Sequence, residues 1–202
     1  MHSITKDFDF CYGHRVWTQA LDAELSCNTA CKCRHLHGHQ GKITVKLTAS
    51  DLEAGMVTDF HHLNFFKKFV DDYFDHKMIM DRKDPLLSIM IEDIWPDLDC
   101  DPTLDVRTNE PYWIEVPCKT FPAQSFAYPN PKLIREHVVP AMMEMLEGLV
   151  VVNFIPTSEN LSMFFFYHIK DVLNSKSDVV NKWMKLDSVV FQETPKTSAI
   201  YF

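Results

Sequence analysis

The segment from Cys31 to His39 carries the residue types best able to do chemistry in this chain. It reads Cys-Lys-Cys-Arg-His-Leu-His-Gly-His. In an extended strand, residues i and i+2 point to the same face, so His37 and His39 can present two imidazoles to one metal ion. Gly38 between them allows the backbone or a ligand to approach closely. Cys33 beside such a site is a candidate acid/base or nucleophile, because a nearby cation favours the thiolate.

Two other interpretations of the segment stay open on the residues alone. The histidines can be solvated side chains of a polar strand. Alternatively, Cys27, Cys31, Cys33 and a histidine can form a closed structural zinc site, because cysteines clustered with histidines are typical of such sites. A closed site of four protein ligands supports no chemistry, and the chain would then be a zinc-stabilised binding protein without catalysis.

Composition limits the class of protein. The chain has 202 residues, of which 46% are hydrophobic, which is enough for a single domain over 1–202 with one large insertion. The net charge of -8 argues against a nucleic-acid-binding surface. No apolar run is long enough to cross a membrane, and the N-terminal residues lack the apolar core of a signal peptide. We therefore expect a cytoplasmic protein with reduced cysteines and no membrane partner.

The elements that must position these residues follow from apolar periodicity. Alternation predicts strands over 3–17, 39–50, 186–192 and 198–202, and three- and four-residue spacing predicts a helix from about Asp59. A second helix begins after Pro156, with Thr157 or Ser158 as its N-cap. Together they predict an α+β domain with an antiparallel sheet.

The segment 81–155 is the predicted insertion between the two helices. It contains most of the prolines of the chain, so we expect short, interrupted elements there. Strands are predicted over 112–116 and 150–155, and a helix over 131–146 that breaks or kinks near Pro140. Its aromatic residues, Trp95 among them, indicate a packed outer lobe rather than a disordered loop.

Separated motifs of the chain resemble, in order, those of the 6-pyruvoyl-tetrahydropterin synthase and 6-carboxy-tetrahydropterin synthase family. A Phe-x-x-x-His motif ends at His14, and Cys-x-x-x-His-Gly-His runs from Cys33 to His39. Further matches are Gly-x-x-x-Asp-Phe at 55–60, Phe-Asp-His at 74–76, Pro-Thr-Ser-Glu-Asn at 156–160 and Glu-Thr at 193–194. The matches cover roughly 1–80 and 156–202.

The resemblance implies a tunnelling fold, in which two β-hairpins and two helices form each subunit. It also implies trimers that pair into homohexamers, with active sites at the subunit interfaces. It identifies His14, His37 and His39 as ligands of a catalytic Zn²⁺ and leaves His35 as a bystander. Three imidazole ligands leave a fourth coordination position open, as catalytic zinc requires.

The resemblance also assigns roles to other residues. Cys33 matches the catalytic cysteine, and Asp75 and His76 match the acid/base pair. Neighbours on an extended chain face apart, so Asp75 and His76 need an irregular backbone to act on one site; alternatively, His76 only caps a helix C-terminus. Glu193, with Thr194 beside it, matches the carboxylate that binds the pterin, whose N–H groups its two oxygens can accept together.

The family substrate is 7,8-dihydroneopterin triphosphate, a small-molecule partner. The spacing between Cys33 and His37 resembles the bacterial branch that forms 6-carboxy-5,6,7,8-tetrahydropterin, acetaldehyde and triphosphate, on the way to queuosine and other 7-deazaguanine bases. The alternative is elimination of triphosphate to give 6-pyruvoyl-tetrahydropterin. A third, aldolase-like branch typically has Glu near the cysteine position, and no acidic residue lies between Cys33 and His37.

Overall fold

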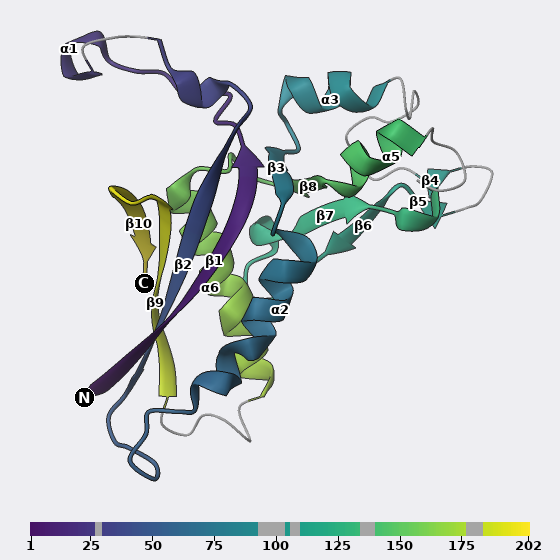
Figure 1. The fold of residues 1–202 in the computed structure, drawn as a ribbon. Helices are drawn as coiled ribbons and strands as arrows, with labels where there is room; N and C mark the ends of the chain where they lie inside the picture. The colour runs from purple at the N-terminus through teal and green to yellow at the C-terminus, as the bar shows by residue number, and fades with distance from the viewer. Residues whose placement is uncertain (27–29, 93–103, 106–109, 134–139, 177–183) are drawn as a thin grey trace.

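The computed structural model describes residues 1–26, 30–92, 104–105, 110–133, 140–176 and 184–202. An eight-stranded sheet in the order β10-β9-β2-β1-β3-β8-β7-β6 forms its centre (Figure 1). The strands of this sheet are β1 (His2–His14), β2 (His37–Ala49), β3 (Lys77–Asp81), β6 (Trp113–Val116), β7 (Phe126–Pro129), β8 (Leu149–Val152), β9 (Met184–Thr194) and β10 (Thr197–Tyr201). The helices are α1 (Ala23–Ser26), α2 (Asn64–Tyr73), α3 (Pro85–Glu92), α5 (Pro140–Glu147) and α6 (Ser158–Ser175). A separate short pair consists of β4 (Leu104–Asp105) and β5 (Glu110–Pro111).

The four strands β10, β9, β2 and β1 form the antiparallel part that alternation predicts. Along β1, Phe8, Phe10 and Tyr12 are buried while the residues between them are exposed or partly buried. Helices α2 and α6 cover this apolar face (Figure 1). The ring of Phe165 in α6 lies 6.2 Å from that of Phe10 and 5.7 Å from that of Phe66 in α2, between centroids. Residues of α3 and α5 approach the other face at the Gly13 end of β1.

The predicted helix starts are confirmed. Asp59 caps a short 3₁₀ turn, Phe60–Leu63, by accepting a hydrogen bond from the backbone N–H of His61, and α2 follows directly. Thr157 is the N-cap of α6, since its side chain accepts from the backbone N–H of Asn160. Satisfying such free N–H groups is what fixes a helix start.

Most of the segment 81–155 continues the sheet. Strand β3 runs parallel to β1, β8 runs parallel to β3, and β7 and β6 add antiparallel strands at the edge. The sheet as a whole is therefore mixed. The predicted α+β class is confirmed, and the predicted antiparallel strands make up one part of the sheet. A long crossover, residues 82–148, separates β3 from β8, and such a connection allows parallel pairing. The predicted strands at 112–116 and 150–155 correspond to β6 and β8.

The side chains of this segment pack in two places. Phe126 and Val150 belong to the main core beneath α2 and α6, and a second apolar cluster around Met80, Leu87 and Leu146 lies farther out. A helix is predicted over 131–146 with a break near Pro140, and α5 begins at Pro140. Residues 134–139 of that helix lie outside the described residues, as do Cys27 and Trp95. Among the described helices, none has the length and apolar character needed to span a membrane.

Candidate active site

Strand register brings three histidines together at one end of the apolar face. His14 is paired with His37, and Tyr12 is paired with His39, so all three imidazoles project from the same side of β1 and β2. The ring centroid of His14 lies 4.6 Å from that of His37 and 5.2 Å from that of His39, and the last two are 4.9 Å apart. The alternation of these strands thus delivers the cluster that the sequence predicts.

Backbone carbonyl groups orient two of these rings. His14 Nδ1 lies 2.7 Å from the carbonyl oxygen of Pro156, just before α6, and His37 Nδ1 lies 2.8 Å from that of His35. A carbonyl oxygen can only accept, so each Nδ1 carries a hydrogen, and in the neutral ring Nε2 keeps its lone pair. This is the tautomer in which histidine binds a metal through Nε2, with the other nitrogen held by a backbone acceptor.

Glu193, near the end of β9, completes the group. Its Oε1 lies 2.9 Å from His39 Nε2 and 3.3 Å from His14 Nε2, and its Oε2 accepts a 2.6 Å hydrogen bond from Ser158. One ligand atom from each of His14, His37, His39 and Glu193 lies within 4.8 Å of the others. Contact with His14, helped by the Ser158 hydroxyl against the effect of burial, lowers the pKa of the Glu193 carboxyl to about 2.

These residues fit a divalent zinc ion. The Nε2 atoms of His14, His37 and His39 are buried and have no partner with hydrogen-bond geometry. His37 Nε2 has no polar contact among the described residues, whereas the Nε2 atoms of His14 and His39 face Glu193 Oε1. Three imidazole nitrogens and a carboxylate oxygen that converge in this way are a donor set that suits a cation. Burial, helped by the neighbouring imidazoles against the effect of Glu193, lowers the pKa of His39 and favours the neutral form that binds metal. Imidazole and carboxylate are ordinary zinc ligands.

Cys33 lies beside this group but not within it. It is part of a short 3₁₀ turn, Lys32–Arg34, that precedes β2. Burial, then the neighbouring Cys31 thiol and the negative charge of Glu193, raise the pKa of Cys33. The backbone N–H of Val16, two residues after His14, donates to the Cys33 carbonyl at 2.8 Å, so the turn with Cys33 adjoins the His14 end of β1. The surroundings of Cys33 hold it as a thiol, so a thiolate here requires a cationic neighbour.

Asp75 and His76 lie elsewhere, next to Cys11. The backbone N–H of Cys11 donates to Asp75 Oδ1 at 2.8 Å, and the N–H of His76 donates to the Cys11 carbonyl at 2.6 Å. His76 has the left-handed φ of 59°, an irregular backbone as expected, and its Nδ1 lies 3.0 Å from Asp75 Oδ2. Burial raises the pKa of Asp75, but the hydrogen bond from the Cys11 N–H and the contact with His76 outweigh it, so the Asp75 pKa is lowered. Cys11 is exposed between buried Phe10 and Tyr12, so this group faces away from His14.

Thr194 is the last predicted site residue, and three residues near the two groups had no predicted role in a site: Ser158, Cys11 and Tyr12. Thr194 hydrogen-bonds Thr197 at 2.7 Å within the β9–β10 turn. The sequence predicts for Ser158 only a role as a helix cap. Its position in the Pro-Thr-Ser-Glu-Asn motif is the feature that could have indicated its contact with Glu193. The sequence predicts no such role for Cys11, nor for Tyr12, whose buried hydroxyl has no hydrogen-bond partner among the described residues and whose ring lies 5.8 Å from that of His39.

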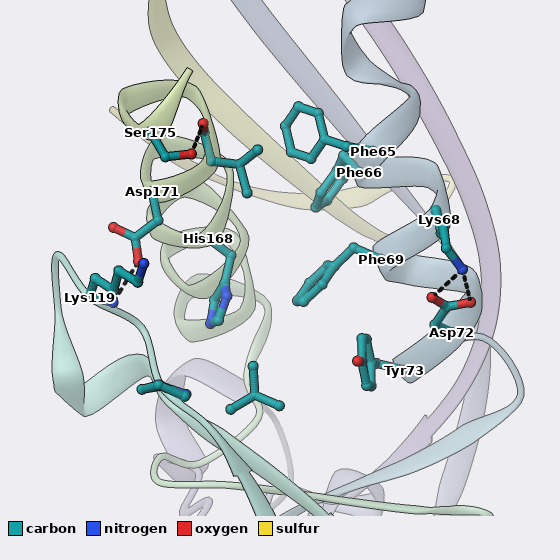
Figure 2. Close-up of a pocket in the computed structure, with 13 residues that line it drawn as sticks. Phe65, Phe66, Lys68, Phe69, Asp72, Tyr73, Lys119, His168, Asp171 and Ser175 are labelled. Carbon is teal, nitrogen blue, oxygen red and sulfur yellow. Dashed lines mark hydrogen bonds and ion pairs between the residues drawn. The ribbon is translucent and has the colours of Figure 1, made fainter. Parts of the chain in front are cut away.

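A separate cavity of about 430 Å³ lies between α2 and α6, away from the histidine cluster (Figure 2). Figure 2 shows phenylalanines of α2 facing His168 of α6 across it, with the Lys68–Asp72 ion pair at the rim. No predicted site residue lines this cavity in the described part of the chain. It is a gap in the helix layer, with an apolar floor of phenylalanines and charged side chains such as Lys68 and Asp171 around it.

A family model described as 6-pyruvoyl tetrahydropterin synthase matches residues 3–202. The 6-carboxy-5,6,7,8-tetrahydropterin synthase of Aquifex aeolicus is 37% identical over 92 residues, which are 41% of this chain and 55% of that protein. The protein of the same name from Rickettsia typhi is 32% identical over 94 residues, 46% of this chain and 61% of its own. The chain thus spans little more than half the length of these curated relatives.

Solved structures match over the whole chain. An uncharacterized protein from Wolinella succinogenes superposes with a TM-score of 0.81 and 35% identity, covering 100% of this chain and 97% of that one. A 6-pyruvoyltetrahydropterin synthase mutant from Plasmodium vivax has a TM-score of 0.50 and 16% identity, covering 99% and 96%. The second likeness concerns the fold alone.

Proposed function

From the premise that this chain belongs to the 6-pyruvoyl tetrahydropterin synthase family, we propose that it is a zinc-dependent lyase of the carboxy-forming type. The reaction converts 7,8-dihydroneopterin triphosphate to 6-carboxy-5,6,7,8-tetrahydropterin, acetaldehyde and triphosphate. The observation that carries the proposal is the convergence of three buried Nε2 atoms on one point beside the Glu193 carboxylate. The names of the Aquifex and Rickettsia relatives favour this product over 6-pyruvoyl-tetrahydropterin.

His14, His37 and His39 would hold the zinc ion. When bound, zinc supplies a Lewis acid that lowers the pKa of a coordinated hydroxyl and stabilises developing negative charge. The carbonyls of Pro156 and His35 keep the two Nδ1 hydrogens in place, so the chain fixes the ligand rings before any ion arrives. Such preorganisation spares the site the cost of ordering its ligands.

Glu193 anchors the pterin in this proposal. Its pKa of about 2 keeps it ionised at neutral pH, so both oxygens can accept hydrogen bonds from ring N–H and amino groups. Ser158 already donates to Oε2 and thereby orients the carboxylate. Thr194, next along β9, is the weaker candidate for a pterin contact. The alternative role for Glu193 is that of a fourth zinc ligand. The two roles differ in their consequence: replacing a pterin anchor leaves the zinc affinity unchanged, whereas replacing a ligand lowers it.

Two groups exchange protons with the substrate side chain. Cys33, on the histidine side, takes a proton from carbon after losing its own, which its raised pKa allows only beside a positive charge. His76 exchanges a proton from the other side, with Asp75 at 3.0 Å to orient the ring and support the imidazolium. Because His76 faces away from His14 in one chain, we propose that active sites lie between subunits, in trimers paired into hexamers.

The products decide between the two reactions. The zinc-loaded protein is incubated with 7,8-dihydroneopterin triphosphate, and acetaldehyde and triphosphate are measured together. The proposal expects both in equal amounts. Triphosphate without acetaldehyde would identify the pyruvoyl-forming reaction instead. If neither product forms, the result favours the non-catalytic zinc protein, in which Cys31 and Cys33 are metal ligands. Such a protein would also lose its zinc on Cys33→Ala, whereas the enzyme would keep it.

A further inference from the structure

The outer face of the sheet carries a second group of metal-binding side chains. One ligand atom from each of Cys11, Asp75 and His76 lies within 4.8 Å of the others. These donors are a thiol, a carboxylate and an imidazole, and they lie on the side of β1 away from His14. We propose that they form a second metal site, specific for thiophilic divalent cations such as zinc and separate from the three-histidine site.

Backbone hydrogen bonds hold these three residues together, so their proximity is a feature of the fold. Two hydrogen bonds join Cys11 to the Asp75–His76 pair, one at 2.8 Å to Asp75 Oδ1 and one at 2.6 Å from the His76 N–H. His76 adopts φ of 59°, a conformation that a non-glycine residue holds only when its surroundings impose it. That turn is what directs the imidazole back towards Cys11, because neighbours on a regular strand point apart.

The arrangement within the group is typical of a metal site. Asp75 Oδ2 lies 3.0 Å from His76 Nδ1, so the carboxylate orients the ring and leaves Nε2 for an ion. Carboxylate–histidine–metal arrangements of this kind are common, and the carboxylate raises the basicity of the ligand. Sulfur and imidazole together select zinc-like cations over magnesium or calcium, which prefer oxygen ligands.

A hollow of about 610 Å³ gives an ion access to the group. Cys11 and His76 line it, together with the thioether side chains of Met78, Met90 and Met145 from β3, α3 and α5. The soft sulfur atoms around the hollow favour the same thiophilic cations as Cys11 does. The His76 side chain is 78% exposed, so its ring can adjust to the ion without disturbing the core.

Cobalt(II) tests the proposal, because a cobalt–thiolate bond gives a near-ultraviolet charge-transfer band that an all-histidine site lacks. Metal-free full-length protein is titrated with Co²⁺, and bound metal is counted by equilibrium dialysis. We expect two equivalents per chain and the thiolate band. C11S should lose the band and bind the second equivalent at least tenfold more weakly. A wild-type protein with one equivalent, or a C11S protein with an unchanged band, overturns the proposal.

Two further variants assign the band. H37A removes a ligand of the first site and should keep the thiolate band of the second. The C31S/C33S double variant removes the other neighbouring thiols and should also keep it. Loss of the band in C31S/C33S and its retention in C11S would place the thiolate at the 31–33 turn and refute the second site. Circular dichroism of each variant confirms that it is folded.

A consequence for catalysis rests on the proposed function. An ion held by Cys11 and His76 removes the imidazole from proton transfer, so zinc beyond the first equivalent should inhibit turnover. C11S should relieve that inhibition. A second bound equivalent that leaves turnover unchanged would contradict the role of His76 in catalysis, while the metal site itself would stand on the cobalt measurement.

Discussion

The histidines of this chain differ in what their ring nitrogens contact, and that difference is the basis for assigning the metal site. His14 and His37 each direct Nδ1 to a backbone carbonyl and turn a buried Nε2 towards the same point beside Glu193. His35, in the middle of the same motif, has an exposed side chain. Residue spacing alone predicts a metal site here but does not choose among its three histidines.

Replacing His37 should therefore remove the metal. We expect His37→Ala to lower the zinc bound per chain, measured by mass spectrometry after dialysis, with an affinity loss of at least about 100-fold, since one of three ligands is gone. His35→Ala is the matched control. It removes a neighbouring imidazole but keeps the carbonyl that orients His37, so zinc should stay bound. Full zinc occupancy in His37→Ala would refute the assignment.

The role of Glu193 is separable from that of the histidines. Glu193→Gln keeps the shape and an acceptor for Ser158 but places an amide where the carboxylate would receive a pterin N–H. We expect KM to rise by about tenfold or more, because hydrogen bonds to a charged partner contribute roughly 1.5–3 kcal/mol. Zinc content should be unchanged.

Thr194→Ala is the comparison for Glu193→Gln. It removes the neighbouring hydroxyl, which hydrogen-bonds Thr197 within the turn, and should change KM little. Loss of zinc from Glu193→Gln would instead identify Glu193 as the fourth metal ligand, and the pterin would then need another anchor.

Elements differ in how far local sequence determines them. Strands β1, β2, β9 and β10 and the starts of α2 and α6 are predictable, because alternation and N-cap residues such as Asp59 and Thr157 are local signals. The parallel pairing of β3 with β1 and β8 is not, because it joins segments far apart in the chain. The Cys11–Asp75–His76 group depends on that pairing and on one left-handed residue, so no spacing rule reveals it.

Helix α6 contains a histidine that should make stability depend on pH. His168 is 8% exposed, packs its ring 4.4 Å from that of Phe164, and has Nε2 2.9 Å from the Gln124 carbonyl. Burial lowers its pKa from 6.5, against the opposing effects of that carbonyl and Asp171. Between the lowered pKa and 6.5, the unfolded chain binds a proton that the folded chain does not, so stability falls as pH falls below 6.5.

The free energy of unfolding of the metal-free protein is measured with urea at several pH values between 7.5 and 5. His168→Phe removes the titrating group, so it should reduce the slope of unfolding free energy against pH by up to about 1.4 kcal/mol per pH unit in that window. His2→Ala, which alters an exposed histidine, should leave the slope unchanged. Equal slopes for wild type and His168→Phe would contradict this account.

At the scale of the whole molecule, the tunnelling fold of this family is extended by strands from the 81–155 segment. These strands are not a detachable cover, since Phe126 and Val150 pack in the main core. A buried ion pair, with Arg15 Nε 3.0 Å from Asp84 Oδ2, also ties the end of β1 to this segment. The segment therefore stabilises the domain as part of its sheet, and we expect its deletion to destabilise the main core.

The two faces of that sheet carry the two halves of the proposed chemistry. The proposed zinc ligands project from the helix-covered face, with Cys33 in the turn that adjoins the end of β1, while His76 lies with Cys11 on the other face. We propose that a single chain does not bring Cys33 and His76 to one substrate and that a second copy supplies one of them. Closed symmetric oligomers do this routinely, because the same contact repeats at every interface.

Mixing inactive variants tests this directly. Cys33→Ala and His76→Ala should each be nearly inactive alone. Dissociated and reassembled together in equal amounts, they should recover about a quarter of wild-type activity, since random pairing leaves that share of interfaces with both residues intact. A mixture of Cys33→Ala with His37→Ala should stay inactive, because both residues belong to the same chain's half of the site. No recovery in the first mixture would show that each chain carries a complete site of its own. Recovery in the control would show that Cys33 and His37 of one site come from different chains, and either result would contradict the proposed arrangement.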